Sequence, residues 1–222
     1  MSDRDELGAA MPHDPDVSTA QLGWLRPRAV GRSVLDLGCG DGRTAREIGG
    51  SAIRYIAVDC DPIALERCRS SCPAVETVAC DMRGVPESLG HFDLVLCLGN
   101  TFCLLWDVDE AVSALKRWAS MLSTGGMIVL DDLAGQHWPE VAEGNWICGI
   151  SDDGASQLVW ADHDAVLAIR QGDAVDVDSW SLKEGDCRMR IWTSGALRLA
   201  ASAAGLSLRR VPEAGVLIMR SA

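Results

Sequence analysis

The sequence predicts an α/β fold, with a doubly wound, mostly parallel sheet of seven strands whose last strand is antiparallel. Three observations predict it. Residues 34–42, Val-Leu-Asp-Leu-Gly-Cys-Gly-Asp-Gly, are an apolar run that ends in an acid and passes into alternate glycines. Further apolar runs alternate with helix-like segments, and most of these runs also end in an acid. Residues 136–193 show turn signals instead of helical periodicity, which predicts a small added antiparallel sheet.

The first run and its glycines predict a strand, a sharp turn and a helix that begins at Arg43. Glycine has no Cβ, so the backbone at Gly38, Gly40 and Gly42 can turn sharply and pass close to a ligand. This order builds cofactor sites at the carboxyl ends of parallel strands. The third glycine comes two residues after the second, which departs from the dinucleotide-binding fingerprint, and no phosphate-loop motif is present.

The other elements of the predicted core follow in order along the chain. Asp61 before Pro62 is typical of a helix start, and Asp107 followed by Glu110 is a capping-box pattern that starts another helix. The last two strands should form an antiparallel hairpin at the edge of the sheet. The further predicted strands are residues 54–59, 75–82, 92–100, 125–131, 206–211 and 215–220, and the last helix spans 194–204.

This organisation divides the chain into three parts. Residues 16–135 and 194–222 should form the core, and residues 1–15 a flexible tail. Residues 136–193 should form an antiparallel insertion over the carboxyl ends of the strands, where it would act as a substrate lid. A decorative or dimerising sheet is the alternative for this segment. Its predicted strands are residues 146–150, 157–162, 165–170, 174–181 and 187–193.

The order of these motifs resembles the class I (Rossmann-like) S-adenosylmethionine-dependent methyltransferase family, of the small-molecule type. The Asp-x-Gly-x-Gly-x-Gly pattern of residues 36–42 is similar to the first motif of that family, and the resemblance covers roughly residues 20–135 and the C-terminal end. It implies S-adenosyl-L-methionine as the cofactor. Residues 98–102, Leu-Gly-Asn-Thr-Phe, are similar to N-methyltransferases of the glycine and sarcosine type, which implies methylation of an amine nitrogen.

The resemblance also implies a role for each site residue. Asp36 would lie near the methionine amino group, and Asp59 would accept hydrogen bonds from the ribose hydroxyls. Asp81 would accept one from the adenine amino group, with Met82 packed on the ring. The remaining cofactor contacts would come from the glycine turn (Gly38, Cys39, Gly40 and Gly42), from Cys60, and from Cys97, Leu98 and Asn100, which would line the methionine side and face the substrate.

The predicted insertion is unusually acidic and rich in tryptophan. Residues 131–186 contain 13 Asp and Glu against two basic residues, a net charge of −11. Acids and indole faces attract cations, so Trp138 and Trp192 are candidate substrate contacts. A solvated outer face of hairpins would be equally acidic. Alternation along residues 188–192 puts Arg188, Arg190 and Trp192 on one face of a strand. The two arginines are candidates for binding a substrate carboxylate or for pairing with the acids of the insertion. His137 is the candidate general base, and a structural role is its alternative; no catalytic residue follows from the motifs.

Composition excludes several other classes of protein. The formal net charge of −12 argues against a nucleic-acid partner, and the Asn-Pro-Pro-aromatic signature of base methylation is absent after the fourth strand. No apolar stretch is long enough to span a membrane. Nine cysteines without an apolar leader predict reduced thiols and a cytoplasmic location, and their spacing predicts no metal site. A homodimer, an O-methyltransferase, and a non-methylating enzyme or sensor that binds the cofactor are left open.

Overall fold

The computed structural model describes residues 15–222. Its large sheet has the strand order β10-β11-β5-β4-β1-β2-β3. Strands β1 to β5 are parallel, and β11 is antiparallel to both of its neighbours, so the predicted sheet and its closing hairpin are confirmed. The strands are β1 Ser33–Leu37, β2 Arg54–Asp59, β3 Glu76–Ala79, β4 Phe92–Cys97, β5 Leu122–Asp131, β10 Leu206–Val211 and β11 Val216–Ser221.

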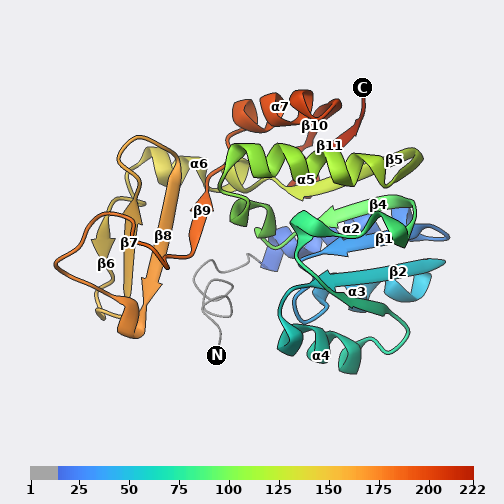
Figure 1. Ribbon diagram of the computed structural model, residues 1–222, viewed down its shortest axis with the longest axis horizontal. Helices are drawn as coiled ribbons and strands as arrows, with labels where there is room; N and C mark the ends of the chain where they lie inside the picture. Colours follow the sequence, from blue (N-terminus) through green and yellow to red (C-terminus); the bar gives the residue numbers. More distant parts are fainter. Residues whose placement is uncertain (1–14) are drawn as a thin grey trace.

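Helices cover both faces of this sheet (Figure 1). Leu35 and Leu37 point to the face covered by α5 and α7, while Val34 points to the face covered by α2, α3 and α4. This alternation is the period of two expected of a strand buried on both sides. The helices are α2 Pro15–Ala29, α3 Arg43–Ile48, α4 Pro62–Ser71, α5 Val108–Ser120, α6 Leu133–Ala142 and α7 Ser194–Ala203; 3-10 turns are η1 Gly49–Ser51, η2 Met82–Gly84, η3 Glu87–Leu89, η4 Thr101–Leu104, η5 Gly172–Ala174 and η6 Pro212–Ala214.

Two helix starts confirm their predicted caps. The Asp61 carboxylate accepts a hydrogen bond from the backbone N–H of Ile63 (2.8 Å), with Pro62 in the first turn of α4. The Asp107 carboxylate accepts one from the backbone N–H of Glu110 (3.0 Å) at the start of α5. Each cap satisfies an N–H that the helix itself leaves unpaired. Within residues 15–222, no helix is long and apolar enough to cross a membrane.

The predicted small sheet is present and has the strand order β6-β7-β8-β9, with every neighbouring pair antiparallel. It lies off the carboxyl ends of the parallel strands (Figure 1). Its own core joins Leu133 of α6, Leu167 of β8 and Met189 of β9 to Cys103 of η4. The strands are β6 Gly149–Ile150, β7 Ser156–Trp160, β8 Val166–Gln171 and β9 Arg188–Arg190.

Two parts of this insertion differ from the prediction. Residues 133–142 form helix α6, because the Asp132 carboxylate caps it through the N–H of Gly135 (3.1 Å) and Leu133 packs into the small core. Residues 174–181 form no strand. Side chains satisfy their backbone instead: Gln157 donates to the carbonyls of residues 176 and 179, and Arg170 donates to those of residues 179 and 181. The division at residues 136 and 193 stays a prediction, and residues 1–14 of the predicted tail lie outside the described residues.

A buried ion pair fixes the loop that leads into β9. The Arg170 guanidinium on β8 donates two hydrogen bonds to the Asp186 carboxylate, both 2.8 Å long. The two side chains are 3% and 8% exposed. The hydrogen bonds from Arg170 lower the pKa of Asp186 below its usual value. Because the pair is shielded from water, removal of one partner would leave the other charge buried and uncompensated.

We therefore expect Arg170→Met to lower the free energy of unfolding by about 3–5 kcal/mol. The double variant Arg170→Met with Asp186→Leu should recover part of this loss. Urea denaturation followed by tryptophan fluorescence measures both.

Lys183→Met is the matched control, because Lys183 pairs with Asp176 where both side chains are well exposed. It should cost less than about 1 kcal/mol. Equal losses for the buried and the exposed pair would contradict the importance of the buried one.

Candidate active site

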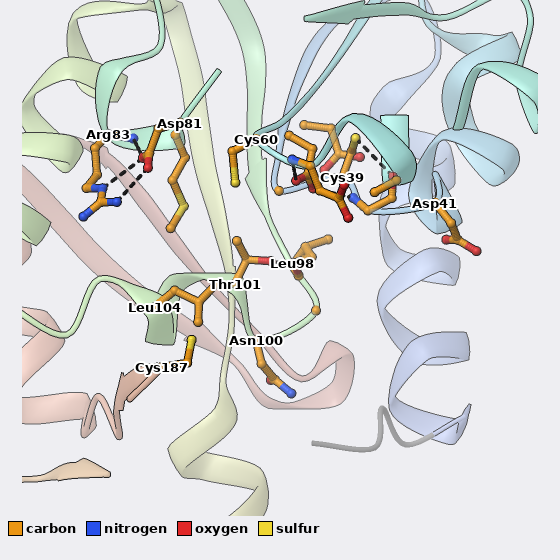
Figure 2. Close-up of a pocket in the computed structure, with 18 of the residues that line it drawn as sticks. Cys39, Asp41, Cys60, Asp81, Arg83, Leu98, Asn100, Thr101, Leu104 and Cys187 are labelled. Atoms are coloured by element: carbon orange, nitrogen blue, oxygen red, sulfur yellow. Dashed lines mark hydrogen bonds and ion pairs between the residues drawn. The ribbon is translucent and has the colours of Figure 1, made fainter. Parts of the chain in front are cut away.

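A cavity of about 590 Å³ opens at the carboxyl ends of β1, β2 and β4. Its wall consists of the glycine turn after β1, the ends of β2 and β3, residues 98–106 after β4, and residues 186–189 of the insertion. Figure 2 shows side chains from these segments around one space. The volume lies within the range of sites that hold small molecules, and the position at the strand ends is where open α/β sheets bind ligands.

The glycine turn after β1 needs its glycines for two different reasons. Gly38, Gly40 and Gly42 all have positive φ, at 68°, 54° and 88°, which side chains disfavour. A Cβ at Gly38 would also overlap the Thr101 side chain, whereas a Cβ at Gly40 would meet nothing within 4 Å. Gly40 therefore presents bare backbone to the cavity. Gly42 faces Cys68 on α4, 2.8 Å from where its Cβ would lie, and is not on the cavity wall.

Asp36 is a buried carboxylate on the cavity wall, with 2% of the residue exposed. The Tyr55 hydroxyl donates a hydrogen bond of 2.6 Å to its Oδ2. Burial raises the pKa of Asp36 from 3.8 to about 6; the Tyr55 hydrogen bond and the charge of Arg43 oppose this rise, and the charge of Asp59 adds to it. A cation in the cavity would stabilise the ionised form of this group.

Asp59 joins two turns with one carboxylate at the end of β2. Its Oδ2 accepts a hydrogen bond from the backbone N–H of Gly40, and its Oδ1 accepts one from the N–H of Asp61, each 2.9 Å long. Each carboxylate oxygen can accept a further hydrogen bond. Asp59 therefore orders the wall and keeps acceptor capacity toward the cavity that it lines.

At the end of β3, Asp81 and Arg83 form a close pair (Figure 2). The Arg83 guanidinium donates to both oxygens of Asp81 (2.9 and 2.7 Å) and to Glu110 (2.9 Å). These hydrogen bonds raise the pKa of Arg83 above its usual value. Met82, which lies between Asp81 and Arg83 in the sequence, lines the cavity. Its carbonyl accepts a hydrogen bond from the Trp118 indole (3.0 Å). The structure thus holds this wall in one arrangement.

A buried acid behind the cavity holds the turn after β4. Asn100 has a φ of 62°, and its backbone N–H donates to Asp131 Oδ2 (2.7 Å). The other oxygen of Asp131 accepts from the Gln21 amide (2.7 Å), and burial raises the pKa of Asp131. Leu98 and Asn100 consequently line the cavity, as does Thr101, whose hydroxyl donates to the Leu98 carbonyl (2.8 Å).

The structure brings ten of the twelve predicted cofactor residues to one wall. The exceptions are Gly42, described above, and Cys97. The Cys97 side chain is fully buried in the core at the end of β4, and burial raises the pKa of its thiol well above the usual value. The residues on the wall are Asp36, Gly38, Cys39, Gly40, Asp59, Cys60, Asp81, Met82, Leu98 and Asn100.

The predicted base and substrate contacts do not join them. His137 Nδ1 lies 3.3 Å from Glu140, and its ring stands 5.7 Å from that of Trp146. Trp192 is buried: its indole donates to the Leu105 carbonyl (3.2 Å) and packs on the Phe102 ring. None of these groups lines the cavity.

Two further candidates also fall elsewhere. Arg190 donates to both oxygens of Asp164 (2.7 and 2.5 Å) and to the Trp106 carbonyl (2.6 Å), off the cavity wall. Trp138 belongs to α6, but its side chain lies outside the described part of the structure. In residues 15–222, no group of three or more acidic, histidine or cysteine side chains is placed to hold a metal ion.

Sequence reasoning missed several residues of the wall. Arg43, Trp106 and Met189 line the cavity, and no motif marks them. Arg188, predicted together with Arg190 as a candidate ligand of a substrate carboxylate, does line the cavity. Its strand ends the insertion, so its arrival at the cavity depends on tertiary packing, and spacing along the chain carries no signal for that.

Known proteins resemble this chain in sequence and in structure. Residues 34–126 match the family profile described as "Methyltransferase domain". "Cypemycin N-terminal methyltransferase" from a Streptomyces species is 34% identical over 103 residues, 46% of this chain and 42% of that protein. "Glycine N-methyltransferase" from Oryctolagus cuniculus is 31% identical over 143 residues, 56% of this chain and 48% of that protein. The chain thus matches less than half the length of each relative.

A solved structure covers more of the chain. S-adenosylmethionine-bound CalS10, an amino pentose methyltransferase from Micromonospora echinaspora involved in calicheamicin biosynthesis, has a TM-score of 0.62 at 19% identity and covers 99% of this chain and 96% of its own. This likeness shows the fold alone. The profile match over residues 34–126 and the motifs on one wall confirm the predicted resemblance to the class I S-adenosylmethionine-dependent methyltransferase family.

The buried Asp36 predicts a pH dependence of stability. Its pKa is higher in the folded protein than in the unfolded chain, so the folded state binds the extra proton between the two values, and stability falls as the pH rises from about 4 to 6. The difference between pKa values of 3.8 and about 6 corresponds to about 3 kcal/mol. Asp36→Asn should therefore be more stable than the wild type at pH 7, with the gap closing toward pH 4.

Urea denaturation of the ligand-free proteins from pH 4 to pH 8 measures this gap. Asp41→Asn serves as the control, because Asp41 is exposed at the edge of the same cavity, so that loss of its charge should change stability by less than about 1 kcal/mol. A parallel pH dependence for Asp36→Asn and the wild type would contradict the prediction.

Proposed function

We propose that this protein transfers the methyl group of S-adenosyl-L-methionine to an amine nitrogen of a small molecule. One observation carries this proposal. Ten of the twelve residues that the family resemblance assigns to the cofactor line the same cavity as residues 98–106 and the insertion. A methyl donor and an acceptor held there would meet in a confined space, and alignment supplies much of the rate enhancement of such a transfer.

The chemistry of the wall fits the proposed cofactor. S-adenosylmethionine would supply an activated methyl group on its sulfonium. Asp36 would hold its cationic amino group, which explains why a carboxylate is buried there with no cationic partner in direct contact among residues 15–222. Asp59 would accept from the ribose hydroxyls with its remaining acceptor capacity. Gly40 would let the cofactor approach the backbone, and Met82 would pack on the adenine ring.

The proposal that nitrogen is the methylated atom rests on similarity to known proteins and not on the negative charge of the insertion. One relative described above is named as an N-methyltransferase and the other as an N-terminal methyltransferase, and residues 98–102 resemble the N-methyltransferases of the glycine and sarcosine type. Of the acids in residues 131–186, only Asp186 lines the cavity, and Arg170 neutralises it. The net charge of the insertion therefore adds little attraction for a cation at the wall itself. His137, directed to Glu140, gains no support as a base.

The insertion would act as the predicted substrate lid. Residues 186–189 close one side of the cavity, and β9 packs against η4 of the core. A closed wall excludes water, which favours a neutral amine over its protonated form at the point of attack. On this view the core, residues 16–135 and 194–222, holds the cofactor, and residues 136–193 contribute to the choice of acceptor.

We expect S-adenosylmethionine and its demethylated product to bind with micromolar affinity in isothermal titration calorimetry. Asp59→Ala should weaken binding by ~1–3 kcal/mol, because buried hydroxyls would lose their acceptor and the Gly40 and Asp61 N–H groups would lose theirs. Asp109→Ala, an exposed change on α5, should leave the affinity unchanged. A wild-type protein that binds neither ligand would refute the cofactor assignment.

A screen with methyl-labelled cofactor should show transfer to amines in preference to phenols and carboxylates. Mass spectrometry of the product identifies the methylated atom. Transfer confined to phenols would favour the O-methyltransferase alternative. Tight cofactor binding without transfer to any class would favour a non-methylating enzyme or a sensor.

A further inference from the structure

The insertion brings one arginine, Arg188, to the cavity wall. Its contribution is residues 186–189, Asp-Cys-Arg-Met. Asp186 is neutralised by Arg170 and also accepts a hydrogen bond from the backbone N–H of Lys183 (2.7 Å). Met189 is apolar and almost fully buried. Arg188 is therefore the side chain that sets the sign of the charge on this part of the wall.

The three arginines of the small sheet differ in what they bind. Arg170 is held by Asp186, and Arg190 by both oxygens of Asp164. Arg188 has no carboxylate partner among residues 15–222. Its one hydrogen bond in the described structure is a long contact of 3.4 Å with the Lys183 carbonyl. Most of its five N–H donors are thus available to a ligand.

Arg188 is nevertheless held in place. Its backbone pairs with Ala168 at the start of the β8–β9 ladder, and the Arg170–Asp186 pair fixes the chain two residues earlier. Its guanidinium carbon lies 5.0 Å from the centre of the Trp106 ring. Trp106 lines the cavity as well. An aromatic face orients the guanidinium plane without using its N–H groups.

We propose that Arg188 binds a carboxylate of the acceptor, so that the acceptors are amino acids or other amines that carry a carboxylate. This proposal rests on the proposed function and names its substrate class. The planar fork of arginine donates two parallel hydrogen bonds to a carboxylate. The neighbouring wall is apolar at Leu104 and Met189, which strengthens such a pair by excluding water.

The arrangement also separates the two ends of such an acceptor. Arg188 belongs to the insertion and lies over the Trp106 ring, whereas the Thr101 side chain lies against Gly38 of the glycine turn. Figure 2 shows Leu98 beside the glycine turn, and Cys187 next to Leu104 at the contact of the insertion with η4. A carboxylate bound at Arg188 would leave the amine free to point toward the methyl donor.

The first test is binding to protein saturated with S-adenosylhomocysteine. The probes are the protein amino acids, each paired with its own carboxamide, and phosphoethanolamine, screened by thermal shift and measured by calorimetry. At least one amino acid should bind, about 100-fold more tightly than its carboxamide. No amino acid bound, or equal binding of the carboxamide, would overturn the proposal. Tighter binding of phosphoethanolamine would overturn it in favour of a phosphate group.

The second test is substitution. Arg188→Met should weaken binding of the preferred amino acid about 100-fold and change that of its carboxamide less than about threefold. Arg188→Lys should fall between, because it keeps the charge and loses the fork. Arg198→Met, an exposed change of equal charge on α7, is the control and should change nothing. Equal losses for the acid and the carboxamide would mean that Arg188 only clamps the insertion to Trp106, which would overturn the proposal.

Turnover separates this proposal from the proposed function. With methyl-labelled cofactor, Arg188→Met should raise KM for the amino acid and leave kcat nearly unchanged, because the carboxylate is remote from the reacting nitrogen. Binding of an amino acid that depends on Arg188, without methyl transfer, would refute the methyltransferase activity and leave the carboxylate site standing. Methyl transfer whose KM is unchanged in Arg188→Met would support the methyltransferase activity and refute the carboxylate site.

Discussion

The site depends on the attachment of one turn to the neighbouring strand. The N–H groups of Gly38 and Cys39 both donate to the Val58 carbonyl (2.8 and 3.0 Å), and that of Gly40 donates to Asp59. Strand β2 thereby holds the turn after β1 open against the cavity. Positive φ angles make this path available to glycine at little cost and to other residues only with strain. Without this attachment, the backbone that faces the cavity would have no fixed position.

Two buried acids, Asp36 and Asp131, lie near this turn. Burial raises the pKa of each, so both oppose folding at neutral pH. Their uses differ. The Asp131 carboxylate accepts hydrogen bonds from the Asn100 backbone N–H and from the Gln21 amide, and it thereby holds the turn after β4. In the part of the chain that the structure describes, Tyr55 is the one direct donor to Asp36. Asp36 lies on the wall, where its negative charge is available to a ligand.

The sequence predicted the core well, because the strand periodicity, the glycine spacing and the helix caps are local signals. Asp61 and Asp107 cap their helices as their patterns indicate. The insertion was harder. Helix α6 contains Gly135 and Pro139, which sequence reasoning treats as breakers, yet an Asp132 cap and the packing of Leu133 sustain it. The composition of residues 174–181 is typical of a strand, but their carbonyls accept hydrogen bonds from the Gln157 and Arg170 side chains instead of from a neighbouring strand. These contacts depend on the tertiary structure, so the sequence does not reveal them.

The candidate site shows the same division. The residues at the strand ends reached the wall because parallel strands bring their carboxyl ends together. Trp192 and Arg190 do not line the cavity, because each forms hydrogen bonds within the protein. The Trp192 indole donates to the Leu105 carbonyl, and Arg190 donates to Asp164 and to the Trp106 carbonyl. Alternation placed them on one face of a strand, but it does not say whether that face meets a ligand or the protein.

The small core beneath the insertion has a consequence for how this protein can be recombined with similar proteins. It takes Cys103 and Leu104 from the core domain as well as residues of α6, β8 and β9, and Trp106 contacts both Arg188 and Arg190. The segment after β4 is therefore structurally part of the insertion, although the chain separates them. A chimera that exchanges the insertion alone would break this shared packing. A functional exchange would have to carry residues 101–106 together with residues 133–193, as one module in two pieces.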